Sequence, residues 1–393
     1  MKKKLLFFVA ALIVPFLVQS QTIELLEVGG WMESAYVKWT SDVDADSYNV
    51  YYSGEGVVDQ KIDDQLIRSY GTYFRADVLG MTAGEYTITV IPVVSGVEGV
   101  AAETSPVEVS NYDRTGFSFS NGRVPGSYKM DGTLKDGAEI LYITESTKNS
   151  ISMDVTGANA NPCVGLQEIL EGFKKGNDNR PLVVRFVGQI TDLDYMLNGD
   201  IVVENKNNAS SYITLEGVGD DAVVDGWGIR IKNASNVEIR NLGLMNCDSS
   251  EGDNIGLQQG NDYIWVHNCD LFYGNAGSAG DQQKGDGALD VKKSTYVTIS
   301  YNHFWDTGKS NLLGLSEKTT EGLYITYHHN WYDHSDSRHP RVRYYSAHVY
   351  NNYYDGIAKY GVGATESSSV FVEANYFRNC KYPMLISIQG SDV

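Results

Sequence analysis

A short apolar segment that recurs along the second half of the chain is the sequence feature that most restricts its fold. Aligned copies begin 22 to 33 residues apart, and they read NVEIRNLGL (236–244), YIWVHNCDLF (263–272), YVTISYNHFW (296–305), YITYHHNWY (324–332), SAHVYNNYYD (346–355) and SVFVEANYFR (369–378). Earlier copies are LVVRFVGQI and YITLEGVG. A period of this length is typical of a solenoid. Each repeat has little room for a helix, which predicts a β solenoid.

An asparagine holds the same place in four of these copies, namely Asn302, Asn330, Asn352 and Asn375. Asparagine tolerates left-handed backbone and bonds to its own turn. Stacked at one corner, the four side chains would form a ladder along the solenoid axis. The pattern predicts an all-β chain that forms a right-handed parallel β-helix from about residue 180 onward, with function in its longer turns. The whole β-helix domain is expected to span residues 136–393.

The first 20 residues read as a secretory signal peptide rather than as part of the fold. Three lysines precede the apolar run Leu5–Val18, and small residues follow it. This order of charge, apolar run and cleavage site is typical of export signals. We therefore expect a secreted protein. No later stretch is apolar enough to span a bilayer, so no membrane insertion is expected.

Residues 21–110 read as short strands with alternating apolar and polar residues, as in a small β-sandwich. Trp39 is a candidate core aromatic, and Tyr86 leads a strand after a turn, as in sandwich domains. This part resembles a fibronectin type III domain, for which we expect a spacer role. Residues 111–135 are rich in Gly, Ser and Asn without periodicity, which predicts a linker.

One helix is expected after this linker. Asn161 can cap it, Pro162 suits its first turn and Gly176 can end it. Its apolar positions at helical spacing are Val164, Leu166, Ile169, Leu170 and Phe173. We expect this helix to cover one end of the β structure.

Charge restricts the partners of the chain. The formal net charge is −19, and removing a signal peptide with three lysines and no acids makes it −22. Nucleic acid is excluded as a general partner, because phosphate binding needs a basic face. An acidic polysaccharide needs a local basic cluster or a bound cation to overcome this field. The four cysteines include no CxxC pair, so disulfides and buried free thiols both remain open.

Arginines follow one of the repeats at close spacing. In DHSDSRHPRVR, Arg338 and Arg343 are five residues apart. Two arginines this close repel each other unless an anion lies between them, and each side chain suits a carboxylate. Lys309 lies in the turn before, in DTGKSNLLG. For one pair alone, a solvated basic turn is the commoner explanation.

Acidic residues occupy the turns of two other repeats. Glu251 and Asp253 form one group, and Asp286 and Asp290 form the other. Four-residue spacing places Asp286 and Asp290 on one face of a strand. If the repeats stack, these acids meet the basic residues in adjacent layers. Several carboxylates suit Ca²⁺, which takes hard oxygen ligands in flexible geometry.

From about residue 136 onward the chain resembles the pectate lyases of polysaccharide lyase family 1. The matching pieces, in family order, are VVDGWGIRIKNASNVEIRNL, IWVHNCDLF, DGALDVKKSTYVTISYNHF, KSNLLG, YITYHHNWY, RHPRVR and HVYNNYY. The resemblance implies Ca²⁺ ligands at Asp253, Asp286 and Asp290, with Glu251 as the fourth. It implies substrate-carboxylate binding by Lys309.

The resemblance also implies that Arg338 is the catalytic base and that Arg343 holds the substrate. The implied reaction is β-elimination on polygalacturonate (pectate), in which a base removes the C5 proton and the C4 oxygen leaves. Cations stabilise the negative charge that develops on the uronate carboxylate. Because an arginine must lose its proton to act as a base, we expect an alkaline optimum. We expect a monomer.

The chain departs from the family at two places. The family has Trp-Ile-Asp-His where this chain continues from Trp265-Val266 with His267-Asn268, so a contact behind the site is expected to differ. Family chains generally continue beyond the position of Val393, so the chain is expected to be truncated at its C-terminus.

Alternatives are a polygalacturonase, a pectin lyase, a non-catalytic β-helix adhesin and a zinc site. Asp220-Asp221 and Arg230–Lys232 are similar to pieces of polygalacturonases, but the Asn-Thr-Asp and Gly-His-Gly motifs of that family are absent. The acids of the Ca²⁺ set disfavour a metal-free pectin lyase, and the combined basic residues disfavour an adhesin. Zinc could bind His328, His329 and His334, but adjacent strand histidines are expected to point to opposite faces.

Overall fold

The computed structural model describes residues 23–41, 44–272, 284–316 and 323–387, so the predicted signal peptide at 1–20 lies outside the described residues. The chain divides into two compact units. The first contains residues up to Gly29, Tyr36–Val78 and Glu85–Glu108, and the second contains Gly30–Ala35, Leu79–Gly84 and Val109–Val393. Among the described helices, none has the length and hydropathy needed to cross a membrane.

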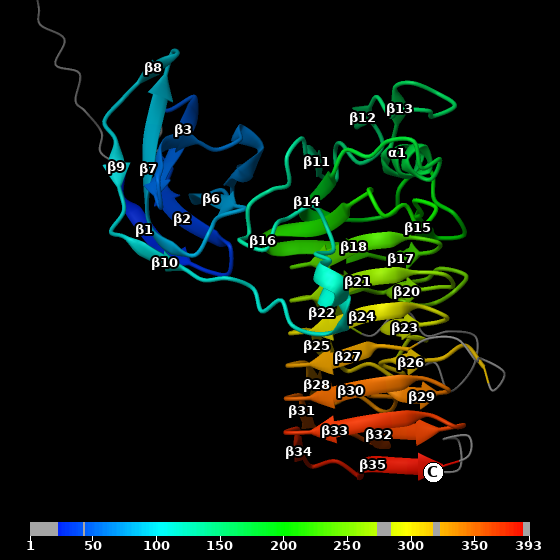
Figure 1. Ribbon diagram of the computed structural model, residues 1–393. Helices are drawn as coiled ribbons and strands as arrows, with labels where there is room; N and C mark the ends of the chain where they lie inside the picture. Colours follow the sequence, from blue (N-terminus) through cyan, green and yellow to red (C-terminus); the bar gives the residue numbers. More distant parts are fainter. Residues whose placement is uncertain (1–22, 42–43, 273–283, 317–322, 388–393) are drawn as a thin grey trace, which may run out of the picture. The chain divides into compact units, whose positions relative to one another are not determined.

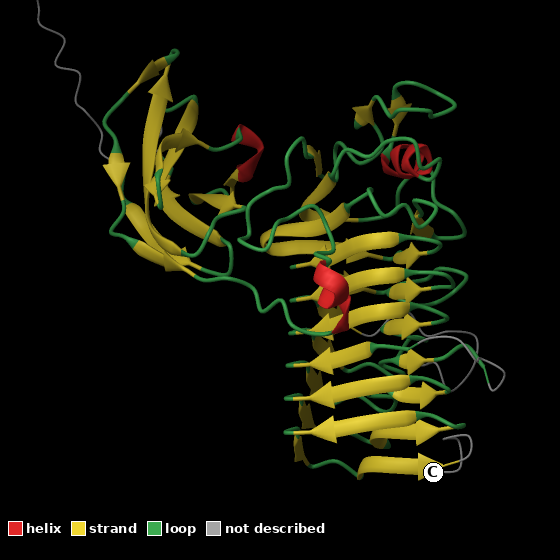
Figure 2. Ribbon diagram, viewed as in Figure 1, coloured by secondary structure: helices red, strands yellow, loops and turns green. Residues whose placement is uncertain are grey.

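The N-terminal unit is built from antiparallel sheets, as the alternating segments predict (Figures 1 and 2). One sheet has the order β1-β2-β6-β5, with β1 (Leu25–Gly30), β2 (Ser34–Thr40), β5 (Ile67–Ser69) and β6 (Tyr73–Leu79). The other is β10-β7-β3-β4 with β8 and β9 beside β7, and comprises β3 (Ser47–Gly54), β4 (Val57–Lys61), β7 (Gly84–Val94), β8 (Val97–Glu98), β9 (Ala102–Glu103) and β10 (Val107–Val109). A short 3₁₀ helix, η1 (Asp64–Leu66), precedes β5. Trp39 is fully buried and packs against Tyr48 and Phe74, so its predicted core role is confirmed.

The second unit stacks parallel strands in three columns, and the predicted parallel β-helix is confirmed (Figure 1). The first column contains β18 (Ser235–Arg240), β21 (Asp262–His267), β24 (Thr295–Ser300), β27 (Ile325–His328), β30 (Ser346–Tyr350) and β33 (Ser369–Glu373). The second contains β19 (Gly243–Met245), β22 (Asp270–Phe272), β25 (His303–Trp305), β28 (Trp331–Asp333), β31 (Tyr353–Asp355) and β34 (Tyr376–Arg378). The third contains β15 (Asp200–Val203), β17 (Gly228–Ile231), β20 (Ile255–Leu257), β23 (Leu289–Val291), β26 (Leu312–Leu313), β29 (Arg341–Arg343), β32 (Tyr360–Thr365) and β35 (Tyr382–Ser387).

The long strand β16 (Ile213–Asp225) pairs with both β18 and β19, and so joins the first two columns into one sheet. This sheet also contains β11 (Glu139–Ile143) and β14 (Leu182–Ile190). In the first column the aligned repeat positions pair one to one, in the order Val237, Ile264, Val297, Ile325, Ala347 and Val370. The repeat spacing therefore predicted the register of the stack.

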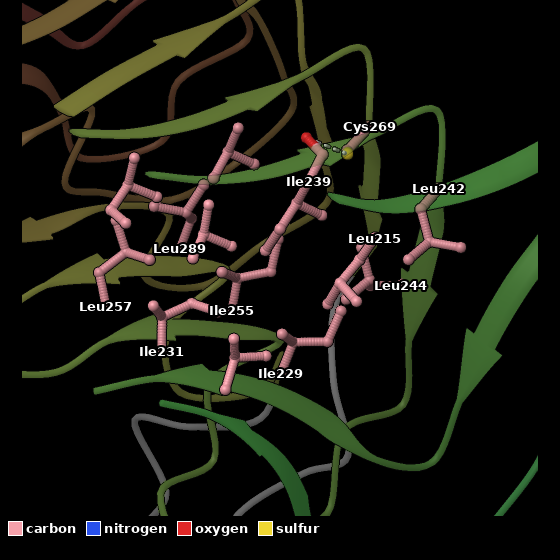
Figure 3. Close-up of a cluster of buried hydrophobic side chains, with 14 of the residues drawn as sticks. Leu215, Ile229, Ile231, Ile239, Leu242, Leu244, Ile255, Leu257, Cys269 and Leu289 are labelled. Atoms are coloured by element: carbon pink, nitrogen blue, oxygen red, sulfur yellow. Dashed lines mark hydrogen bonds between the residues drawn. The ribbon is translucent and has the colours of Figure 1, made fainter. Parts of the chain in front are cut away.

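Alternation along the strands fills the interior of the coils. Val237 and Ile239, two positions apart in β18, are both fully buried in the core. Figure 3 shows part of this interior, where aliphatic side chains from consecutive coils point toward one another. All four cysteines are unpaired thiols, and Cys163, Cys247 and Cys269 are buried. Burial in this apolar interior raises the pKa of Cys269 to about 12.

The predicted asparagine ladder is confirmed at the corner between the first two columns. The Nδ2 atom of Asn302 donates to Oδ1 of Asn330 at 3.1 Å, and Asn330 donates in the same way to Asn352 at 3.0 Å. Asn352 donates to Asn375 at 2.9 Å. The amides of Asn302 and Asn330 also donate to strand carbonyls, so buried polar groups are paired along the axis.

The predicted helix exists, but its predicted start is wrong. Helix α1 spans Leu166–Phe173 and follows Gly165, whereas Asn161 accepts a hydrogen bond from the amide of Val155. Cys163–Val164 forms β13 and pairs with β12 (Ser152–Met153), which keeps this segment extended. Gly176 closes the C-terminal end, since its amide donates to Phe173.

The four buried apolar positions of α1 face the core as predicted, whereas Val164 is exposed. Gln167 hydrogen-bonds both the amide and the carbonyl of Val202 in β15, the first strand of the third column. The helix therefore covers the end of the β-helix, as expected (Figure 2).

Residues 111–135, for which the sequence predicts a linker, lie along the outer face of the first column. They include the 3₁₀ helix η2 (Phe117–Gly122), where the amides of Phe117 and Ser118 donate to the hydroxyls of Thr326 and Thr298. The segment thereby buries a polar layer on this face. Its polar composition suits hydrogen bonding to strand side chains, so the prediction of a linker from this composition is wrong.

Glu216 and Glu238 lie in this polar layer beside Arg240, and Glu238 contacts His267 at 3.1 Å. Burial would raise the pKa of Glu238, but Arg240 and the hydrogen bond from His267 hold it at about 2. The expectation that His267 lies behind the candidate site is wrong. Its side chain points to the outer face of the first column, where its hydrogen-bond partners are Glu238 and Asn268.

Candidate active site

The turns that precede the third-column strands bring the predicted site residues together. Gly287, Lys309 and Ser337 pair as successive parallel bridges, so each of these turns lies directly against the next. The amide of Asn254 donates to the carbonyl of Gly287, which adds the turn of Asp253 to the same series. Residues far apart in sequence therefore share one strip of the surface of the β-helix.

Carboxylates converge on a lysine at one end of this strip. The Nζ atom of Lys292 lies 3.0 Å from Oδ2 of Asp253, 3.8 Å from Glu251 and 3.9 Å from Asp290. Asp253 and Asp290 are almost fully buried, whereas Glu251 is partly exposed and accepts a hydrogen bond from Gln258. The structure thus assembles three of the four predicted metal ligands around one largely buried ammonium group.

Asp286, the remaining predicted ligand, pairs with Lys309 at 3.1 Å. It is close enough to raise the pKa values of Asp253 and Asp290. The prediction that Asp286 and Asp290 lie on one face of the same strand is wrong. Only Asp290 lies in β23, where its Oδ1 accepts the amide of Leu312, and Asp286 lies in the preceding turn.

The charge balance of this group favours a cation. Burial, and then the neighbouring Asp290, raise the pKa of Asp253 well above its usual range. Burial likewise raises the pKa of Asp290, and Lys292 and Arg338 oppose that rise. Two buried carboxylates beside a third acid carry more negative charge than one lysine neutralises, so added positive charge would stabilise their ionised forms.

Space between the two buried carboxylates depends on Gly287. A Cβ atom at this position would lie 2.4 Å from Oδ1 of Asp253 and 2.6 Å from Oδ1 of Asp290. Glycine therefore leaves a gap lined by carboxylate oxygens. An oxygen-rich gap of this kind fits Ca²⁺, and the residues that would hold it are Asp253, Asp290, Asp286 and Glu251.

The arginines lie further along the same strip. Arg338 adopts a left-handed backbone (φ 68°) in the turn before β29, and Arg343 lies in that strand. Burial raises the pKa of Tyr360, and Arg338, Arg341 and Arg343 all oppose this rise. The three arginines are therefore close enough to the Tyr360 hydroxyl to interact with it electrostatically, and Arg338 is also close enough to interact with Asp290.

Sequence reasoning missed two members of this group, Lys292 and Tyr360. Lys292 had a usable signal, because it follows Asp290 by two residues, directly after the end of β23, and two-residue spacing predicts the same face for an extended segment. Tyr360 had none, because it comes from the next coil. Asp220 and Asp221 lie in β16 and Arg230 lies in β17, so the pieces similar to a polygalacturonase belong to different sheets.

Comparisons with known proteins agree on one family. A family model described as pectate lyase matches residues 154–391. A pectate trisaccharide-lyase from Bacillus licheniformis is 33% identical over 220 residues, which cover 56% of this chain and 62% of that protein. Pectate lyase 3 from Pectobacterium carotovorum subsp. carotovorum is 30% identical over 263 residues, which cover 61% of this chain and 69% of that protein. The match thus spans less than two thirds of the Bacillus licheniformis relative.

Among solved structures, a pectate lyase from Bacillus sp. N165 in complex with trigalacturonate superposes with a TM-score of 0.54. Its sequence is 27% identical, and the match covers 67% of this chain and 75% of that chain. This similarity supports the same architecture for the β-helix unit.

Proposed function

The chain belongs to the pectate lyase family, and we propose that it cleaves polygalacturonate by Ca²⁺-assisted β-elimination. The observation that carries this proposal is the single strip of third-column turns, where Asp286 pairs with Lys309 and the buried Asp290 lies close to Arg338. The solved relative was crystallised with trigalacturonate, a short chain of the proposed substrate. We also propose that the N-terminal unit is a fibronectin type III domain that acts as a spacer, and that residues 1–20 are a signal peptide that directs secretion.

Each side chain has a distinct task in this reaction. Lys309 and Arg343 bind the uronate carboxylate, and their charges stabilise the negative charge that develops on it. Arg338 accepts the C5 proton, the C4–oxygen bond breaks, and the electron pair left at C5 forms the C4–C5 double bond. The departing oxygen takes a proton from solvent. Bound Ca²⁺ would add positive charge beside the same carboxylate.

Substitution of Arg338 tests the role of the base. We expect R338K to lose at least about a hundredfold in turnover, in the range of general-base effects, while polygalacturonate binding is retained. R378K is the matched control, because Arg378 is an exposed arginine in β34 of the second column. The measurement is the ultraviolet absorbance of unsaturated product with Ca²⁺ and then with chelator. Reducing ends without this absorbance would instead indicate hydrolysis.

A further inference from the structure

Two histidines and an aspartate converge at the corner after β27, outside the candidate active site. Ligand atoms of Asp113, His328 and His329 all lie within 4.8 Å of one another. His328 ends β27 and is buried, whereas His329 and Asp113 are partly exposed. Asp113 belongs to the segment 111–135 on the outer face of the first column.

The histidines converge because the strand ends between them. His329 has a left-handed backbone (φ 53°), which turns its ring toward the face that carries His328. Their Nδ1 atoms are 2.8 Å apart. The expectation that adjacent histidines point to opposite faces is therefore wrong here. His334, the third histidine of the zinc alternative, instead contacts Asp333 and is exposed.

Surrounding rings hold the three donors in place. Tyr301 stacks on His329 with a centroid distance of 4.6 Å, and its hydroxyl donates to Asp113 at 3.0 Å. Tyr350 stacks on His328 at 5.0 Å. Two aromatic walls and one hydroxyl thus fix the orientation of both imidazoles and of the carboxylate, as the supporting residues of metal sites do.

We propose that Asp113, His328 and His329 form a second metal site, which binds Zn²⁺ or a similar first-row divalent ion and ties segment 111–135 to the β-helix. Two imidazoles and one carboxylate match the ligand preference of such ions, whereas Ca²⁺ prefers oxygen. With metal–nitrogen bonds of about 2.0–2.1 Å in tetrahedral geometry, the two nitrogens would lie roughly 3.3 Å apart. An opening of about half an ångström from the observed contact would suffice.

The protonation states of the two imidazoles favour metal binding at neutral pH. Burial lowers the pKa of His328 to about 4 and also lowers that of His329. Both rings are therefore neutral near pH 7, which is the form that binds metal.

The test is calorimetric titration of the chelator-treated protein with ZnCl₂ in excess Ca²⁺, which occupies the carboxylate site. Co²⁺ absorption spectra provide a second readout, because they report nitrogen ligands. We expect one Zn²⁺ per chain in the parent and in H334Q, and at least about tenfold weaker binding in D113N and H329Q. Both substitutions are at partly exposed positions, and metal-free thermal unfolding will establish that the variants fold.

Unchanged Zn²⁺ affinity in folded D113N and H329Q would overturn the proposal, as would a parent protein that binds no Zn²⁺. Zinc should also raise the unfolding temperature of the parent more than that of D113N, because the ion would hold residue 113 to the sheet. An equal rise in both proteins would place the ion elsewhere and refute the site.

Discussion

Lys292 supplies positive charge to the cluster of carboxylates, and its substitution tests quantitatively how much these carboxylates depend on a neighbouring cation. The Nζ atom lies 3.0 Å from Asp253, and its side chain is 13% exposed. Removing one partner of a buried ion pair costs roughly 3–5 kcal/mol, because the other charge stays buried. We therefore expect K292M to lower the free energy of unfolding by about this amount in chelator.

Calcium should reverse much of this loss. Relative to the parent, a variant that binds Ca²⁺ about a hundredfold more tightly regains about 2.7 kcal/mol at saturating Ca²⁺. The affinity of K292M for Ca²⁺ should also rise, because the ammonium group no longer repels the ion. Both effects arise only if Lys292 and the metal share the same carboxylates.

The assay is urea unfolding with chelator and with Ca²⁺, combined with calorimetric titration of Ca²⁺. K293M is the matched control, because Lys293 is the adjacent lysine and is buried to a similar degree, whereas the lysine in contact with Asp253 is Lys292. An equal loss of stability in chelator and in Ca²⁺, together with weaker Ca²⁺ binding by K292M, would refute the reasoning.

Three further predictions concern the fold. Because the pKa of Glu238 is lowered to about 2, its ion pairs contribute on the order of 3 kcal/mol to stability above about pH 5, and this contribution is lost as the pH falls toward 2. The free energy of unfolding of E238Q should therefore lie below that of the parent at neutral pH, and the difference should shrink as the pH is lowered. Asn330 makes four side-chain hydrogen bonds in the ladder, so N330A should lose roughly 4 kcal/mol in denaturant unfolding, and a loss below about 1 kcal/mol would contradict a structural ladder. F173A should lose about 3–5 kcal/mol and V164A less than about 0.5, and similar values for both would contradict the observed helix start.

The columns of the β-helix were predictable because a solenoid repeats the same local packing arrangement in every coil. Each coil places a pair of aliphatic side chains in the interior, and the alignment of Val237 with Ile264 and Val297 identifies these positions from the sequence alone. Asn330 was predictable for the same reason, since a corner that recurs selects the same side chain. Features that occur only once along the β-helix leave no repeated pattern in the sequence from which they could be predicted.

The start of α1 and the placement of segment 111–135 belong to this second kind. A capping asparagine and a proline predict a helix locally, but pairing of Val164 in β13 prevents it. Asp113 reaches His328 only because the segment lies along the sheet. Contacts between residues so far apart in the sequence have no local pattern, and this also explains why Tyr360 was missed beside Arg338.

In the stack of third-column strands, distances along the site depend on the number of coils between two residues and not on the number of residues in the turns. Neighbouring strands lie about 4.7–4.9 Å apart, whether the turn between them is short or long. Extra residues in a turn would therefore leave the spacing between Asp290 and Arg338 unchanged. Insertion of one whole coil between β23 and β29 would lengthen it by a full strand spacing and separate the carboxylates from Arg338.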